Sequence, residues 1–310
     1  MKSTTIALLM VALAGFGVAH SAEAGQRRKH QGFSITTGSE KEIRDCSQMR
    51  LTVPDGEVLR SEQTMTLPQN SGSTLRIQAP HNGGIFVQGW DRSDYSIKAC
   101  MGAAGDSAAD ARAVLDQLLL SVHDGQLSVQ GPDGETWIGY LLVQAPNGAS
   151  LDLESTNGPI GLNGLSATVQ ARTTNGPISF TDVSGKIKAR AQNGPINVSG
   201  NRGEYHLEAQ NGPIGVDLEG GQWESGELEA TTQNGPLTLT LPEGYQSPVR
   251  VESAGHSPVE CRAVQCKQAM RTWDRPNVIE FGESAPVIRM STVNGPVTIN
   301  STNHKRRQAN

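Results

Sequence analysis

The sequence contains none of the short motifs by which common classes of enzyme are recognised. It has no Gly-x-Ser-x-Gly nucleophile elbow, no Gly-Lys-Ser/Thr phosphate-binding loop and no His-Glu-x-x-His metal-binding helix. Its seven histidines are scattered singly along the chain. We therefore predict a protein that is not an enzyme, with no catalytic, cofactor-binding or metal-binding residues.

The chain also lacks a surplus of positive charge. Its formal net charge is −5, whereas binding to nucleic-acid phosphates requires a concentrated basic surface. Basic clusters occur only near the ends, as Arg27-Arg28-Lys29 and as Lys305-Arg306-Arg307. Both are interpreted as solvated tails, the second within a basic tail at 303–310. Nucleic acid is therefore excluded as the main partner.

Long apolar runs are missing except at the N-terminus. Lys2 is followed by an apolar run over 6–19 and then by Ala22-Glu23-Ala24, which is the layout of a secretory signal peptide. We predict a signal peptide at 1–24, cleaved before Gly25. No later stretch approaches the roughly 20 apolar residues of a membrane helix. The expected product is exported to the periplasm or the cell surface, with no integral membrane segment after cleavage.

Six Asn-Gly-Pro tripeptides are the strongest positive signal, because the first four recur every 18 residues. A fixed period of this size is typical of stacked repeats. In the unit 175–192, Ile178 and Phe180 alternate with polar residues, and Ile187 and Ala189 later alternate with cations. Period-two alternation indicates half-buried strands, so each unit is predicted to be strand, turn, strand, turn. The first strand recurs as six rungs: Ile160 and Leu162, Ile178 and Phe180, Ile196 and Val198, Ile214 and Val216, Leu237 and Leu239, and Val297 and Ile299.

The tripeptide suits a corner between strands. Asn and Gly tolerate left-handed backbone angles, and Pro can open a strand where its missing donor costs little. Stacked corners place the Asn side chains in one column, which can hydrogen-bond along its length. We interpret this column as structural, because the Gly-Gly-x-Gly-x-Asp pattern of calcium-binding solenoids is absent. The predicted ladder comprises Asn157, Asn175, Asn193, Asn211, Asn234 and Asn294.

The period also predicts which outward side chains lie beside one another. A shift of one unit brings Lys186 beside Glu204 and Arg190 beside Glu208. Opposite charges on adjacent strands stabilise a sheet by about 0.2–1 kcal/mol per pair. The same shift places Arg172 beside Arg190, which is unfavourable. The outward residues Lys186, Lys188, Arg190 and His206 form a candidate interaction surface, with an ordinary solvated strand face as the alternative interpretation.

Four cysteines, Cys46, Cys100, Cys261 and Cys266, occur in a chain that is predicted to enter an oxidising compartment, so disulfides are expected. Three pairings are possible, and connectivity cannot be deduced from sequence. We favour Cys261 with Cys266, closing a small loop, and Cys46 with Cys100, tying the N-terminal segment to the first coils. A thiolate metal site is the weaker alternative, because no histidine lies at ligand spacing beside these cysteines.

Composition divides the remaining chain into regions. Residues 25–70 are expected to form a partly disordered N-terminal segment, and residues 71–302 a solenoid. Ala and Leu favour one helix near 106–120, expected to cap an edge or end of the stack. The period fails over 242–287, which is predicted to be a Cys-bearing insertion. Binding residues often lie on loops, so four residues of this insertion are further candidates for the interaction surface: Arg271, Trp273, Asp274 and Arg275.

Three further stretches give the chain a family resemblance. They are Leu-Arg-Ile at 75–77 leading to Gly-Ile-Phe-Val-Gln-Gly-Trp at 84–90, Val-Gln-Ala-Pro-Asn-Gly at 143–148, and Ile-Arg-Met-Ser-Thr at 288–292. With the repeats, they make the chain resemble the bacterial "putative adhesin" family of unknown function, whose exported members are built from β-strand repeats. The resemblance implies an all-β, right-handed parallel β-solenoid, similar to a single-stranded β-helix with coils of 18 residues, and a role in the cell envelope or outside the cell.

Three functional hypotheses follow. The first is a non-enzymatic, adhesin-like interaction module that presents a repetitive surface to a polymer or protein of the envelope or cell surface. The second is a polysaccharide-acting enzyme, for which the outward pairs Asp152 with Glu154 and Glu227 with Glu229 are the candidate acids. The third is a structural or signalling envelope component that docks through the Cys-bearing insertion.

Overall fold

The computed structural model describes residues 34–35, 43–53, 56–70, 72–80, 83–134, 136–255, 257–267 and 277–302. These residues all belong to one compact unit, Gln31–Asn310. The predicted signal peptide at 1–24, the basic tail at 303–310 and the candidates Arg271, Trp273, Asp274 and Arg275 lie outside the described residues.

The described chain is built from strands, with one α-helix and two short 3-10 helices. The elements are β1 (Ser34–Ile35), η1 (Cys46–Gln48), β2 (Leu51–Thr52), β3 (Glu57–Pro68), β4 (Thr74–Gln78), β5 (Ile85–Trp90), β6 (Asp94–Gly105), α1 (Ala108–Leu115), β7 (Leu119–His123), β8 (Gln126–Gln130), β9 (Trp137–Pro146), β10 (Ala149–Ser155), β11 (Ile160–Thr173), β12 (Ile178–Ala191), β13 (Ile196–Gly200), β14 (Glu204–Ala209), β15 (Ile214–Leu218), β16 (Leu228–Thr232), β17 (Leu237–Leu241), β18 (Val249–Ser253), β19 (Val259–Cys261), η2 (Val264–Lys267), β20 (Val278–Phe281), β21 (Ile288–Thr292) and β22 (Val297–Ser301).

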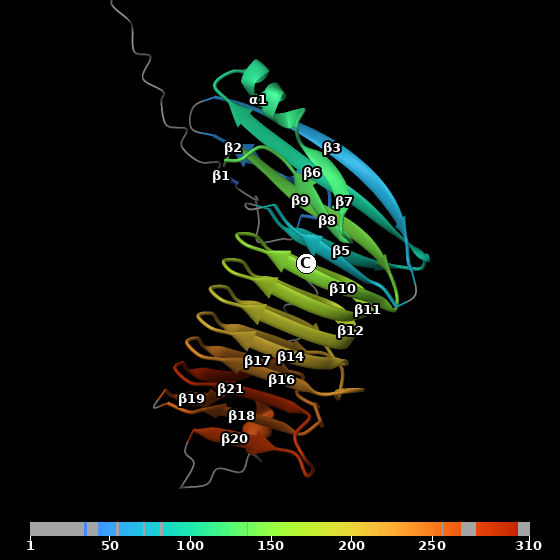
Figure 1. Ribbon diagram of the computed structural model, residues 1–310. Helices are drawn as coiled ribbons and strands as arrows, with labels where there is room; N and C mark the ends of the chain where they lie inside the picture. Colours follow the sequence, from blue (N-terminus) through green and yellow to red (C-terminus); the bar gives the residue numbers. More distant parts are fainter. Residues whose placement is uncertain are drawn as a thin grey trace, which may run out of the picture. The chain divides into compact units, whose positions relative to one another are not determined.

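The strands pair in two long ladders, between which the chain alternates. The first ladder runs β3–β6–β9–β5–β11–β12–β13–β15–β17–β22–β19. The second runs β7–β8–β4–β10–β11–β12–β14–β16–β21–β18–β20. The long strands β11 and β12 contribute their first halves to one ladder and their second halves to the other. Figure 1 shows successive coils stacked from β10 through β16.

The strand register follows the 18-residue period. In the first ladder Ile160 pairs with Ile178, and Ile178 with Ile196. In the second ladder Val169 pairs with Ile187, and Ile187 with Tyr205. All of these pairs are parallel and their side chains are buried between the ladders. The all-β class with one α-helix is confirmed, and the right-handed winding stays a prediction.

Antiparallel strands close the N-terminal end of the stack. β3 pairs with β6, β6 with β9, and β7 with β8, all antiparallel. The 12-residue strand β3 lies within the stretch 25–70 that was expected to be a separate segment. Helix α1 packs against β3 and β6 and is shorter than the predicted 106–120. It ends early because Leu119 and Leu120 begin the hairpin strand β7.

The interval 242–287, predicted to be a Cys-bearing insertion, contains regular structure at the C-terminal end of the stack. That interval contains β18, β19 and β20, and β18 and β19 form one more coil. The last coil along the sequence lies inside the stack: β21 pairs with β16 on one side and β18 on the other. Likewise β22 lies between β17 and β19. Along the sequence, the coil formed by β18 and β19 comes before the final Asn-Gly-Pro coil, formed by β21 and β22. In the stack, the final Asn-Gly-Pro coil lies between β18 and β19 on one side and β16 and β17 on the other.

Aromatic packing and two disulfides reinforce the stack. The ring of Tyr205 meets those of Phe180 and Trp223 edge-on, with centroids 5.8 and 6.0 Å apart. The Tyr205 hydroxyl donates to the Val183 carbonyl at 2.6 Å, and burial raises the pKa of this phenol well above its usual range. Disulfides join Cys46 to Cys100 and Cys261 to Cys266, the pairing that we favoured among the three possible.

Candidate functional site

The outward side of the first ladder carries small, almost uncharged side chains. Its strands from β11 to β22 present two columns that lie in register. We call these columns the neutral face, and Asp217 is its one charged residue. One column is Gly161, Ser179, Asn197, Gly215, Thr238 and Thr298, and the other is Asn163, Thr181, Ser199, Asp217, Thr240 and Asn300.

The outward side of the second ladder is charged, and we call it the charged face. Its charges gather by strand into bands of one sign. The cationic band lies on β11 and β12, and the acidic band lies on the neighbouring strands β14 and β16 and on the residue just before β16. The cationic band is Arg172, Lys186, Lys188 and Arg190, and the acidic band is Glu204, Glu208, Glu227 and Glu229.

The structure brings together the four candidate residues predicted on the solenoid. Lys186, Lys188 and Arg190 lie on β12, and His206 lies beside Lys188 on β14. The Lys186 Nζ is 3.8 Å from a Glu204 carboxylate oxygen. Among the residues that the structure describes, Lys188 has no ion-pair partner, since its register neighbours are Gln170 and His206. The centre of the cationic band is thus an exposed lysine without a carboxylate.

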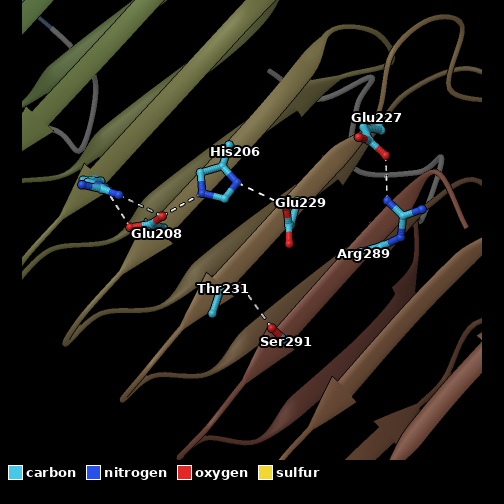
Figure 2. A network of polar contacts seen from close by, with 8 residues as sticks. His206, Glu208, Glu227, Glu229, Thr231, Arg289 and Ser291 are labelled. Carbon is cyan, nitrogen blue, oxygen red and sulfur yellow. Dashed lines mark hydrogen bonds and ion pairs between the residues drawn. The ribbon is translucent and has the colours of Figure 1, made fainter.

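Arg190, Glu208, His206 and Glu229 form a polar chain across three strands. Figure 2 shows the contacts of His206 with Glu208 and Glu229. Arg190 Nε lies 2.8 Å from Glu208 Oε2, and its Nη2 donates to Oε1 at 3.2 Å. His206 Nε2 lies 2.7 Å from the same Oε1, and its Nδ1 lies 3.2 Å from Glu229 Oε2. Burial raises the pKa of Glu208, but Arg190 and His206 outweigh it and leave that pKa below its usual value.

Further contacts tie neighbouring outward side chains together. Arg289 on β21 donates to Glu227 at 2.6 Å, as Figure 2 shows. Arg172 on β11 donates to Asp152 on β10 at 2.9 Å. These side chains are between 25 and 54 % exposed, so each pair adds only about 0.2–1 kcal/mol. The ion pairs of the charged face are therefore screened by solvent and contribute little to the stability of the fold.

Three of the four carboxylates proposed for an enzyme are engaged in these contacts. Asp152 accepts from Arg172, Glu227 from Arg289, and Glu229 lies against His206. A general acid needs a raised pKa. Every described carboxyl group whose pKa departs from its usual value is shifted downward, namely Asp45, Glu208 and Glu260. Within the described residues no group of three or more His, Cys, Asp or Glu could hold a metal ion.

The six corner asparagines lie in one column and hydrogen-bond to one another. Asn175 donates from Nδ2 to Oδ1 of Asn157 at 2.8 Å, and the same contact repeats for each later corner at distances between 2.9 and 3.1 Å. Each of the four inner side chains uses its amide nitrogen toward one neighbour and its oxygen toward the other. The column therefore joins successive coils by side-chain hydrogen bonds.

The sequence reasoning missed several members of the site. Arg289 on β21 lies beside Glu229, 60 residues away, because β21 lies between β16 and β18 in the stack. His206 meets Glu229 at a spacing of 23 residues because extra residues around Trp223 lengthen that coil. The partners Glu204 and Glu208, in contrast, follow from the 18-residue period alone.

The described chain is an all-β, solenoid-like stack in which the strands of successive coils pair in parallel. A model of the Toastrack DUF4097 family matches residues 21–260, and the chain belongs to this family. No curated protein matches the chain in sequence. Within the described residues, no helix has the length and apolar character that crossing a membrane demands. Two disulfides fit an exported protein.

The solved structures that are similar to this chain have low sequence identity to it. A "putative adhesin" from Bacteroides fragilis is 12 % identical, with a TM-score of 0.35 over 80 % of this chain and 99 % of its own. A "putative cell adhesion protein" from Clostridium sporogenes is 11 % identical, with a TM-score of 0.32 over 79 % of this chain and 100 % of its own. A "putative lipid binding protein" from Parabacteroides distasonis is 10 % identical, with a TM-score of 0.36 over 80 % of this chain and 99 % of its own.

Proposed function

We propose that this protein is an exported, non-enzymatic interaction module that binds an anionic polymer of the envelope or cell surface along its cationic band. One observation carries the proposal: four cations lie on two adjacent strands, and the central one, Lys188, has no carboxylate partner among the described residues. Neighbouring strands lie about 4.8 Å apart, so the band offers closely and regularly spaced positive charges to a repeating ligand.

The ion pairs beside Lys188 do not block such a ligand. Lys186 and Arg190 side chains are 74 and 68 % exposed, and their partners are the carboxylates of Glu204 and Glu208. Exposed pairs of this kind contribute only about 0.2–1 kcal/mol, so anionic groups of a polymer can displace them at small cost. Many weak contacts along one chain of ligand then add up to useful avidity. A right-handed winding of the coils completes the proposed scaffold.

The test is a binding titration of purified protein on immobilised polygalacturonate, with neutral dextran as the second surface. Lys188→Glu should weaken binding to polygalacturonate roughly thirtyfold at low salt, because a cation at a polyanionic surface contributes about 1 kcal/mol and charge reversal changes the binding free energy by about twice that amount. The matched control is Arg76→Glu on β4, which makes the same change of charge three strands away from β12. It should change the affinity less than twofold.

Equal losses in both variants would contradict a localised site and leave only a general effect of net charge. Binding that resists 0.5 M salt would also contradict the proposal, because contacts with exposed charges are screened at that concentration. Soluble sugar products measured in the same samples decide against the enzymatic alternative if they are absent and in its favour if they accumulate.

A further inference from the structure

Strand β3 ends the first ladder at the N-terminal end of the stack. It is 12 residues long, and within the described part of the chain its one ladder neighbour is β6. Figure 1 shows it at the outer margin of this group of strands. Because a strand in an antiparallel pair turns alternate backbone groups to either side, the second edge of β3 presents a row of N–H and C=O groups without strand partners.

This edge has little of the usual protection against pairing beyond the charged side chains of Glu57, Arg60 and Glu62. Natural edge strands are short, bulged, or interrupted by proline or lysine. β3 pairs with β6 without a bulge from Glu57 opposite Gly105 to Pro68 opposite Asp94. Its one proline is the last residue, and it contains no lysine. Side-chain contacts do reach it from within the fold, since the Gln63 amide donates to the Leu118 carbonyl and accepts from the Leu120 N–H.

We propose that β3 is a dimerisation edge that pairs antiparallel with β3 of a second copy of this chain, with the two-fold axis at Ser61. A two-fold axis normal to the sheet keeps each side chain on its own face, so it can lie only on a residue and not between residues. An axis at Arg60 would set that residue against its own copy, and an axis at Glu62 would do the same. An axis at Ser61 sets Arg60 opposite Glu62 of the second copy, twice.

The surroundings of these residues suit such a contact. Arg60 and Glu62 are exposed on the same side of β3. A hollow of about 270 Å³ adjoins them, lined by Cys46, Ser47, Met49, Arg60, Ser61, Glu62 and Met101. Lys98 on β6 lies 3.9 Å from Glu62 and 3.8 Å from Asp45. In the dimer Glu62 would thus lie between Lys98 of its own chain and Arg60 of the other, while the hollow receives the incoming side chain.

Such a dimer would join two first ladders into one continuous sheet. Residues 57–65 of each chain would overlap in this register, which is long for a strand pairing. The assembly would carry two cationic bands, but the dimer does not depend on what these bands bind.

The first test is placement of a single thiol. The native cysteines are all in disulfides, so Ser61→Cys introduces one free thiol at the axis. A short bis-maleimide should link Ser61→Cys chains into covalent dimers at micromolar protein. The control is Thr66→Cys, whose two copies would lie about 33 Å apart along the strands, at 3.3 Å per residue, and should remain unlinked. Equal linking of both variants, or of neither, would overturn the proposal.

The second test reverses the charges. Sedimentation equilibrium should show a dimer for the unchanged protein, and Arg60→Glu should weaken dimerisation about tenfold, because it sets like charges opposite each other in two symmetric places. The double variant Arg60→Glu with Glu62→Arg restores opposite charges and should recover most of the affinity. A monomer at 100 μM for the unchanged protein, or a double variant as weak as Arg60→Glu alone, would overturn the proposed pairing.

Discussion

The neutral face and the charged face belong to the same coils yet carry opposite chemistry. In β12 the outward residues Ser179 and Thr181 belong to the neutral face, and Lys186, Lys188 and Arg190, a few residues later, belong to the charged face. Inward, both halves are equally apolar and buried. The repeat therefore fixes the backbone and the core of both ladders, while the outward positions remain free to differ. Function should therefore be separable from stability in this molecule.

Substitutions in the core beneath both faces should have the largest effect on stability. Phe180 is 1 % exposed and packs edge-on against Tyr205. Phe180→Ala should lower the free energy of unfolding by about 3–5 kcal/mol, because it removes a buried ring and leaves a cavity. Urea denaturation measures it, with the outward neighbour Thr181→Ala as the matched control, expected below about 0.5 kcal/mol. Similar losses for both residues would show that the assignment of inward and outward sides is wrong.

Substitutions in the asparagine column at the corners should have the next largest effect on stability. Asn193 donates to Asn175 at 2.9 Å and accepts from Asn211 at 3.1 Å. Asn193→Ala should cost about 1–2 kcal/mol, since each hydrogen bond is worth about 0.5–1.5 kcal/mol and these lie near solvent. Asn294→Ala, at the last corner of the column, should cost about half as much. Equal costs at both positions would mean that the corner turn, and not the column of amides, provides the stability.

The difference between the faces can be sharpened by exchanging their charge. Thr181→Lys places a cation on the neutral face, beside Asn163 and Ser199, and should change stability by less than about 0.5 kcal/mol. Its binding to polygalacturonate should stay within twofold of the unchanged protein, because a lone cation lacks the neighbours that make a band. Lys188→Thr should weaken the same binding severalfold. A gain from Thr181→Lys equal to the loss from Lys188→Thr would show that position on the molecule is irrelevant.

Much of this arrangement could be predicted because the 18-residue period is visible in the sequence. The column from Ile160 to Ile214 and the pairs Lys186 with Glu204 and Arg190 with Glu208 follow from counting 18 residues. The position of the final coil could not be predicted, because Leu228 pairs with Ile288 across 60 residues. No local sequence signal indicates that this coil lies between two coils that precede it in the chain. For the same reason the edge strand β3 was missed: its antiparallel pairing with β6 has no repeat behind it.

The smallest expected effect is a pH dependence of the charged face. Burial raises the pKa of Glu208, but Arg190 and His206 lower it further, so in the folded protein it lies below its usual value of 4.5. A carboxylate with a lowered pKa adds stability that is complete above 4.5 and is lost as the pH falls through the folded value. Because its side chain is 37 % exposed, the contribution is under about 0.5 kcal/mol. Glu208→Gln should therefore melt about 1–2 °C below the unchanged protein at pH 7.

That difference should vanish in acid, because the unchanged protein then carries a neutral carboxyl group as well. The double variant Glu208→Gln with Arg190→Gln isolates the share that comes from the Arg190 contact. Because that contact is lost in both single variants, the double variant should lose less stability than the sum of the two single losses, and the difference is the coupling energy of the pair. A melting difference that persists unchanged down to about pH 2.5, below the usual titration range of carboxyl groups, would assign the effect of Glu208 to packing and remove electrostatics from the stability of this face.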